Sequence, residues 1–448
     1  MSWELLRGDC LSQMPTLEAN SVHSVVVDPP YGLSKEPDIA EVMQCWMDGR
    51  PYRHGSNGLM GAEWDSFIPG PEYWKAAIRV LRPGGHALVF AGTRTVDLMG
   101  IALRFAGFEI RDCLSWAYLS GYSKGLNISA GIDAAKGLAE ARGKLTTPTG
   151  GIHNASQHAI GFTGRQWADN PISPEAHAFR GWTSAIKPAH EPIIVARKPL
   201  DGTIVENVLK WGTGGINSLG CHVGQKHITP TGGILSRGGA GGVFSWSKDP
   251  VNTVHVGYLP PNLLLGHGYG CDNLVCEDAC PVSAFKAQVG QTGGAEETAE
   301  AIPSFRWSEW DEPFLFVRKP TTDEREAGCE ALPLVEAGTA TGPGGMGIAT
   351  NSRGEKIGRP MYHNHHLSLK PVALMRYLCR LVTPVGGTVL DPFCGSASTG
   401  IGALHERMNF VGIERDPKYC EIAEARLKYW DGRAADTAAN RGGISEEW

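Results

Sequence analysis

The chain has 448 residues, of which 42% are hydrophobic, and its formal net charge is −6. This length allows one large domain or two to three ordinary ones, and the charge gives no whole-chain indication of nucleic-acid binding. The sequence has no apolar run near about 18 residues and no signal-peptide pattern at its start. Its 11 cysteines are odd in number and scattered, so we expect a cytoplasmic protein without a membrane span.

Helices and strands alternate over the first part of the chain. The short β-branched segment 21–28 predicts a buried strand, which Pro29 and Pro30 end. Four further elements follow: a helix over 71–85 with a Gly-Gly stop, a strand over 86–92, a helix over 95–108 and a strand over 109–118. This alternation predicts an α/β fold with a parallel, doubly wound sheet.

The C-terminal part repeats the alternation, and the middle interrupts it. The expected C-terminal elements are a helix over 370–387, a strand and glycine-rich turn over 388–400, a helix over 401–408, a strand over 409–416 and a helix over 417–430. The middle is rich in glycine and predicts loops. We therefore expect four parts: a first half of the core over 1–120, a loop-rich insertion over 121–350, a second half of the core over 351–430 and a polar, frayed tail over 431–448.

The segment "DPPY" at 28–31 closes the first strand with an unusual set of groups. An ionised Asp28 only accepts hydrogen bonds, and Pro29 has a carbonyl but no N–H that could compete for the same space. Tyr31 offers a flat face on which a base can stack. The segment predicts a socket for a planar ring with an exocyclic amino group; the alternative is a turn that merely ends the strand.

The segment "VLDPFCGSASTG" at 389–400 places small residues where a strand meets a helix. A ligand can approach such a backbone closely, at the edge where α/β sheets bind ligands. Glu414 ends the next strand and is placed to accept hydrogen bonds from a ribose. A full G-x-G-x-x-G is absent, which favours a smaller adenosine ligand over a dinucleotide. The alternative is an ordinary turn with an incidental acid.

Together, "DPPY" and "DPFCGSASTG" resemble the signature pair of S-adenosylmethionine-dependent DNA amino-methyltransferases. The catalytic motif precedes the cofactor motif, as in the β group of that family. The segments "LLRGDCLSQM" at 5–14 and "NHHLSLKPVALMRYL" at 364–378 resemble two further family segments, and the usual "GSGTT" is "GSAST" here. The resemblance implies a Rossmann-like, circularly permuted sheet, in which the C-terminal half supplies the first two strands.

The resemblance also assigns roles to residues. It implies a catalytic set of Asp28, Pro29, Pro30 and Tyr31. It implies a cofactor-binding set, in which Asp9 faces the adenine and the polar residues of 366–370 hold the methionine part: Asp9, His366, Ser368, Lys370, Asp391, Phe393, Cys394, Gly395, Ser396 and Glu414.

The implied reaction is methyl transfer from S-adenosylmethionine to N6 of adenine in double-stranded DNA, with the base flipped out of the duplex. The insertion over 121–350 is the candidate for target recognition. The alternatives are an N4-cytosine or RNA amino-methyltransferase, and a DNA-binding subunit with a degenerate pocket. A homodimer and a phage or restriction-modification setting are further expectations from the resemblance.

A separate cluster consists of His267, Cys271, Cys276 and Cys280, which could hold a structural zinc ion. The usual C-x-x-C pairs are absent, so free thiols in a loop are the alternative. The "NHH" segment at 364–366 also suggests a metal, but the "LSLKP" that follows it favours the cofactor pocket.

Overall fold

The computed structural model of the chain describes residues 1–56, 58, 63–118, 126–138, 171–186, 189–221, 235–237, 244–246, 262–265, 315–316, 320–336, 361–366 and 368–439. Its centre is a nine-stranded sheet in the order β1-β13-β12-β2-β3-β5-β4-β8-β9. The strands are β1 (Trp3–Arg7), β2 (Val22–Val27), β3 (Leu81–Phe90), β4 (Glu109–Ala117), β5 (His190–Arg197), β8 (Leu263–Leu265), β9 (Leu315–Phe316), β12 (Thr388–Asp391) and β13 (Asn409–Glu414).

The strand order is permuted relative to the chain order, as the resemblance implied. β12 and β13 come from the C-terminal part, yet they lie between β1 and β2 from the N-terminal part. The five strands from β1 to β3 are parallel neighbours. The α/β fold class and the doubly wound arrangement are therefore confirmed.

β5 departs from the sequence prediction in two ways. It runs antiparallel to both of its neighbours, β3 and β4, so the sheet is mixed rather than wholly parallel. It also lies within 121–350, the range that the sequence assigned to an insertion outside the core. The physical reason is its apolar run "PIIVA", which is buried throughout, because a short continuous apolar segment is typical of a central strand.

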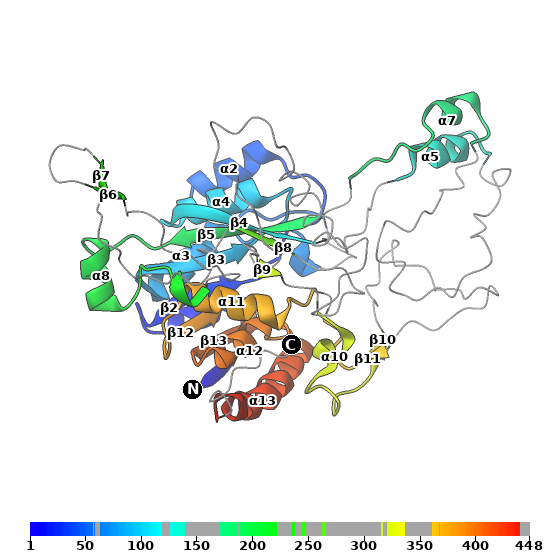
Figure 1. Cartoon of the computed structure of the whole chain (residues 1–448). Helices are drawn as coiled ribbons and strands as arrows, with labels where there is room; N and C mark the ends of the chain where they lie inside the picture. The colour runs from blue at the N-terminus through cyan, green and yellow to red at the C-terminus, as the bar shows by residue number, and fades with distance from the viewer. Residues whose placement is uncertain are drawn as a thin grey trace.

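Helices cover both faces of the sheet (Figure 1). One layer consists of α1 (Cys10–Gln13), α2 (Ile39–Met47), α3 (Pro71–Val80) and α4 (Val96–Phe105); the other consists of α11 (Val372–Val382), α12 (Ser398–His405) and α13 (Pro417–Ala439). Successive residues of a strand point to opposite faces. Val25 and Val27 accordingly pack in the first layer's core, and Val26 packs in the second.

Two element boundaries differ from the sequence prediction. α3 ends at Val80, and β3 begins at once with Leu81, so the Gly84–Gly85 pair lies inside a strand instead of ending a helix. Gly84 has a φ of +72°, and the pairing of β2 with β3 shifts register here, so the strand is irregular around this pair. α13 continues to Ala439, past residue 431, where the sequence suggested that a frayed tail begins.

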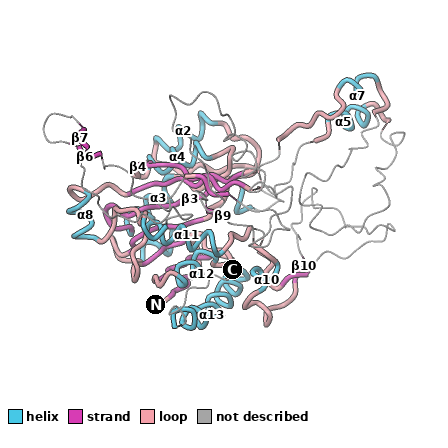
Figure 2. Tube along the Cα trace, viewed as in Figure 1, coloured by secondary structure: helices cyan, strands magenta, loops and turns pink. Residues whose placement is uncertain are grey.

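The remaining elements are short and lie outside the nine-stranded sheet, and α5 and α7 lie together away from it (Figure 2). They are α5 (Ile128–Ala135), α7 (Pro174–Ala178), α8 (Ile204–Trp211), α10 (Thr322–Glu326), the hairpin β6 (Leu235–Arg237) and β7 (Phe244–Trp246), the pair β10 (Val335–Glu336) and β11 (Met361–Tyr362), and the 3-10 turns η1 (Met14–Thr16), η3 (Glu63–Asp65) and η4 (Leu219–Cys221). In the described part of the chain, no helix combines the length and apolarity needed to cross a bilayer.

Candidate active site

The carboxyl ends of β2 and β12 lie side by side at the point where the strand order reverses. The two strands are parallel neighbours, with Leu390 opposite Val25. From this edge the chain runs from β12 toward β13 on one side and from β2 toward β3 on the other. Such switch points are where α/β proteins bind ligands. Asp28 and Gly395, one from each strand end, line a common pocket here, so the two chain-distant motifs come together as predicted.

Asp28 is held through only one of its two oxygens. Its Oδ2 accepts hydrogen bonds from Lys370 Nζ at 2.5 Å and from Ser368 Oγ at 3.1 Å. Its Oδ1 is buried, and no described residue donates to it. Pro29 is buried and Pro30 is half-buried behind it. A buried acceptor without a donor costs about 1–3 kcal/mol, so the arrangement indicates a place for a ligand donor.

The positions of Ser368 and Lys370 refine the sequence prediction. The resemblance assigned both to the methionine part of the cofactor, whereas in the structure both contact Asp28. They line the same pocket as the glycine-rich turn. The reason for the contact is electrostatic, because a carboxylate with a side chain only 17% exposed needs a counter-ion.

Tyr31 is fixed from three sides. Its hydroxyl donates to Glu191 Oε2 at 2.8 Å, its carbonyl accepts from Thr95 Oγ1 at 2.7 Å, and its amide donates to Asp65 Oδ1 at 2.8 Å. Burial, followed by the charges of Asp28 and Glu191, raises the pKa of Tyr31 well above its usual range. The hydroxyl therefore stays protonated and remains a donor.

The turn between β12 and α12 combines an acid with a glycine. Asp391 accepts hydrogen bonds from Phe393 N at 3.0 Å and Thr399 Oγ1 at 2.6 Å, and burial raises its pKa to about 7. Gly395 has a φ of +53°, and a Cβ added to it would lie 2.6 Å from His366 Nε2. Glycine is required here for both reasons. Burial lowers the pKa of His366 to about 4, so its ring is neutral.

Glu414 lies beside this turn, at the end of β13. Its Oε2 accepts from Gly395 N and its Oε1 accepts from Asp416 N, both at 2.8 Å, and burial raises its pKa. A carboxylate can accept about four hydrogen bonds, so both oxygens keep capacity for hydroxyl donors. Cys394 and Ser396 are buried on either side of Gly395 and line the pocket.

Two arginines donate hydrogen bonds to backbone carbonyls around the pocket, and the sequence prediction missed both. Arg426 of α13 is completely buried and donates to Ser396 O at 2.5 Å; burial lowers its pKa to about 10, so it stays charged. Arg325 of α10 donates to the carbonyls of Asn364 at 3.1 Å and His366 at 2.7 Å. A signal existed for Arg426, since its spacing puts it on the apolar face of a predicted helix.

Glu191 is a further residue that the sequence prediction missed. It is the second residue of β5, its side chain is 15% exposed, and its Oε2 lies 3.3 Å from Lys370 Nζ as well as 2.8 Å from the Tyr31 hydroxyl. The available signal was an acid directly before the buried run "PIIVA". An acid at the start of a central strand lies at the edge of the sheet, but its neighbours depend on the strand order.

Asp9 and Phe393 flank the pocket. Asp9 follows β1 and caps α1, where its Oδ1 accepts from Leu11 N at 2.9 Å; the residues that line the pocket do not include it. Its contact with a cofactor adenine therefore stays a prediction. Phe393 does line the pocket, with its ring 5.9 Å from that of Tyr73.

The expected zinc ligands, His267, Cys271, Cys276 and Cys280, lie outside the described residues, so that site stays a prediction. Within the described ranges, no group of three or more His, Cys, Asp or Glu residues is placed to hold a metal. The two histidines of the "NHH" segment pack against Tyr419, with ring distances of 5.8 Å for His365 and 4.5 Å for His366.

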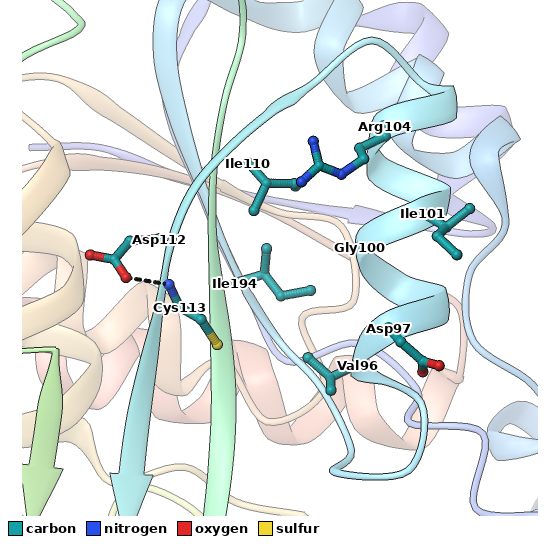
Figure 3. A pocket seen from close by; sticks show the side chains of 9 residues that line it. All are labelled: Val96, Asp97, Gly100, Ile101, Arg104, Ile110, Asp112, Cys113 and Ile194. Carbon is teal, nitrogen blue, oxygen red and sulfur yellow. Dashed lines mark hydrogen bonds between the residues drawn. The ribbon is translucent and has the colours of Figure 1, made fainter.

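A second pocket, of about 260 Å³, lies between α4 and the strands β4 and β5 (Figure 3). It is lined by Val96, Asp97, Gly100, Ile101, Arg104, Ile110, Asp112, Cys113 and Ile194. None of the predicted site residues is among them. The chemistry expected from the sequence is therefore concentrated at the first pocket.

Comparison with known proteins assigns the chain to a family. A family model described as DNA methylase, for N6 and N4 methyltransferases, matches residues 22–210 and 345–425, which together exceed half of the chain. The chain is 39% identical over 66 residues to the type II methyltransferase M.BglI of Bacillus subtilis, and 38% identical over 63 residues to M.HinfI of Haemophilus influenzae. These matches cover 15% and 14% of this chain.

The chain matches less than a fifth of the length of these two relatives, 19% for M.BglI and 18% for M.HinfI. The solved PvuII DNA methyltransferase, described as cytosine-N4-specific, aligns with 97% of this chain and 93% of its own at 11% identity and a TM-score of 0.39.

Proposed function

Because this chain belongs to the N6/N4 DNA methylase family, we propose that it transfers a methyl group from S-adenosylmethionine to the N6 amino group of adenine in double-stranded DNA. The observation that supports this most directly is the buried Oδ1 of Asp28, which no described residue contacts as a donor. It lies in the same pocket as the glycine-rich turn at Gly395. An acceptor for an amino group thus adjoins a turn suited to a nucleoside.

The residues of the second strand end fit S-adenosylmethionine. Gly395 lets the His366 ring lie close against the turn, and Glu414 can accept from ribose hydroxyls. His366 carries a buried Nδ1 without a hydrogen-bond partner in the described residues, and Phe393 adds an aromatic ring. When bound, S-adenosylmethionine supplies an electrophilic methyl group on a positively charged sulfur.

The chain's own residues prepare the substrate nitrogen for attack. The amino group donates one hydrogen to Asp28 Oδ1 and the other to the Pro29 carbonyl, which draws the nitrogen toward a tetrahedral shape and frees its lone pair. With S-adenosylmethionine bound, this lone pair would form the N–C bond, and the electrons of the broken C–S bond would remain on sulfur. The nitrogen then gives one proton to Asp28, which passes it to solvent. Orientation supplies most of the rate gain, and Tyr31 stacks on the base.

The target base must leave the duplex to reach this pocket. Asp28 lines the pocket at the two strand ends and its side chain is only 17% exposed, so a base inside an intact duplex could not reach it. The parts of 121–350 that lie outside the sheet strands β5, β8 and β9 remain our candidate for contacts with the DNA. The expected homodimer stays a prediction.

Two other functions remain as alternatives. An N4-cytosine or RNA amino-methyltransferase would present the same exocyclic amino group to Asp28, and the family covers N6 and N4 chemistry. Asp at the first motif position favours adenine by resemblance. A degenerate DNA-binding subunit is disfavoured, because Asp28, Tyr31 and Glu414 are all present and lie at the two strand ends that meet.

The test is methyl incorporation from labelled S-adenosylmethionine into unmethylated genomic DNA, followed by nucleoside analysis. We expect N6-methyladenine as the product, and we expect Asp28→Asn to lower turnover by about 100-fold or more, since it removes a preorganised charged acceptor. Asp112→Asn, at an exposed position of β4, is the matched control and should retain full turnover. Near-normal turnover of Asp28→Asn would refute the assignment, and N4-methylcytosine would establish the first alternative instead.

A further inference from the structure

We propose that Glu191 is a positioning residue for methyl transfer: it holds Lys370 and Tyr31 together, so that Lys370 covers one oxygen of Asp28 and leaves the other to the substrate. This role rests on the proposed function. Glu191 Oε2 lies 2.8 Å from the Tyr31 hydroxyl and 3.3 Å from Lys370 Nζ. One carboxylate oxygen therefore contacts the group that stacks on the base and the group that orients the acceptor.

The surroundings of Lys370 restrict where its ammonium group can point. Its side chain is 6% exposed, and its ammonium lies 5.3 Å from the ring centre of Tyr31 and 5.0 Å from that of Phe90. It donates to Asp28 Oδ2 from one side, while Glu191 attracts it from another. An ammonium drawn between two carboxylates cannot move across to cover Asp28 Oδ1 as well. Without Glu191, that restraint is lost.

The charges that face Lys370 can be counted from the described residues. Asp28 follows β2 and Glu191 lies on β5, and both are opposite in charge to Lys370; the Tyr31 hydroxyl and the neutral His366 add none. Although burial disfavours the ammonium, these two carboxylates raise the pKa of Lys370 above its usual value. Lys370 thus stays charged across the neutral and mildly alkaline range, and Asp28 keeps its partner.

Loss of a purely structural ion pair at a strand end would affect the kinetics differently from loss of a positioning residue. Glu109 on β4 provides the comparison, because it pairs with Arg197 at the other end of the same strand β5, at 2.6 Å. Loss of that pair removes a similar contact from β5 without touching Asp28, Lys370 or Tyr31. Glu109→Gln is therefore the matched control.

The experiment measures kcat, the dissociation constant of S-adenosylmethionine and the pH profile for the full-length chain, with unmethylated genomic DNA as substrate. For Glu191→Gln we expect kcat to fall roughly 10- to 100-fold through misplacement of the acceptor, with cofactor affinity changed by less than about threefold. The alkaline decline of kcat should move to lower pH, because Lys370 loses one of its two carboxylates. Glu191→Asp keeps the charge and should restore the wild-type alkaline limit at a reduced kcat.

Each outcome bears on the proposal. An unchanged kcat in Glu191→Gln overturns it, as does an equal loss in Glu109→Gln. A Glu191→Gln variant that fails to fold leaves the decision to Glu191→Asp, where a shifted alkaline limit would also overturn it. If the wild-type chain incorporates no methyl group into DNA, the proposed function fails and this role fails with it; if the wild-type is active and the variants match it, only the role of Glu191 fails.

Discussion

Lys370→Met tests whether the buried ion pair at the site exists in solution. The substitution removes an ammonium that is 6% exposed and leaves Asp28 and Glu191, which are 17% and 15% exposed, without a counter-ion. Loss of one partner from a buried pair costs about 3–5 kcal/mol. Both carboxylates keep some contact with solvent, so we take the lower end and expect a loss of about 3 kcal/mol at pH 8.

The loss should depend on pH in a definite direction. Without Lys370, the two carboxylates stay mostly buried with no cation between them, and a proton on either one would neutralise part of that charge. Protons are available for this at low pH and become scarce as pH rises, so the cost of the two unpaired charges grows with pH. The deficit of Lys370→Met should therefore be small near pH 5 and grow toward pH 8.

Urea unfolding followed by circular dichroism at both pH values measures the effect. Lys428→Met is the control, since Lys428 makes a 2.6 Å pair with Glu424 on the surface of α13, where Lys428 is 64% exposed. Exposed pairs contribute at most about 1 kcal/mol. If the two variants lose the same stability, or if the loss in Lys370→Met is independent of pH, the reasoning about the buried pair is wrong.

Two further predictions concern the glycine-rich turn. Gly395→Ala sets a methyl group 2.6 Å from His366 Nε2 at a φ of +53°, so calorimetry should show S-adenosylmethionine binding weakened by about tenfold or more; an unchanged affinity would contradict the close approach. Asp391→Asn removes a carboxyl whose pKa burial raises to about 7. That raised pKa stabilises the wild type at low pH, and the benefit is lost as pH rises through 7. Thermal unfolding should therefore show the variant gaining stability relative to the wild type between pH 5 and pH 8. A difference between the two that does not change with pH would contradict the prediction.

Local patterns in the sequence predicted the separate parts of the site. The β-branched run before Asp28 and the acid at Asp391 each marked a strand end, and the glycine at 395 marked a turn with close approach. These features depend on backbone conformation and burial over a few residues, which short-range periodicity and turn chemistry record. The family resemblance then supplied the permuted order that brings β12 beside β2.

Only the tertiary structure decided which side chains meet. Lys370 and Asp28 are 342 positions apart in the chain, and Glu191 reaches them because β5 enters the sheet antiparallel beside β3. No local pattern encodes such contacts, since they follow from strand order and from the need of buried charges for partners. The sequence alone thus determined the chemical groups and the strand ends that carry them, while the packing of distant strands determined that one oxygen of Asp28 is bound and the other is left for a ligand.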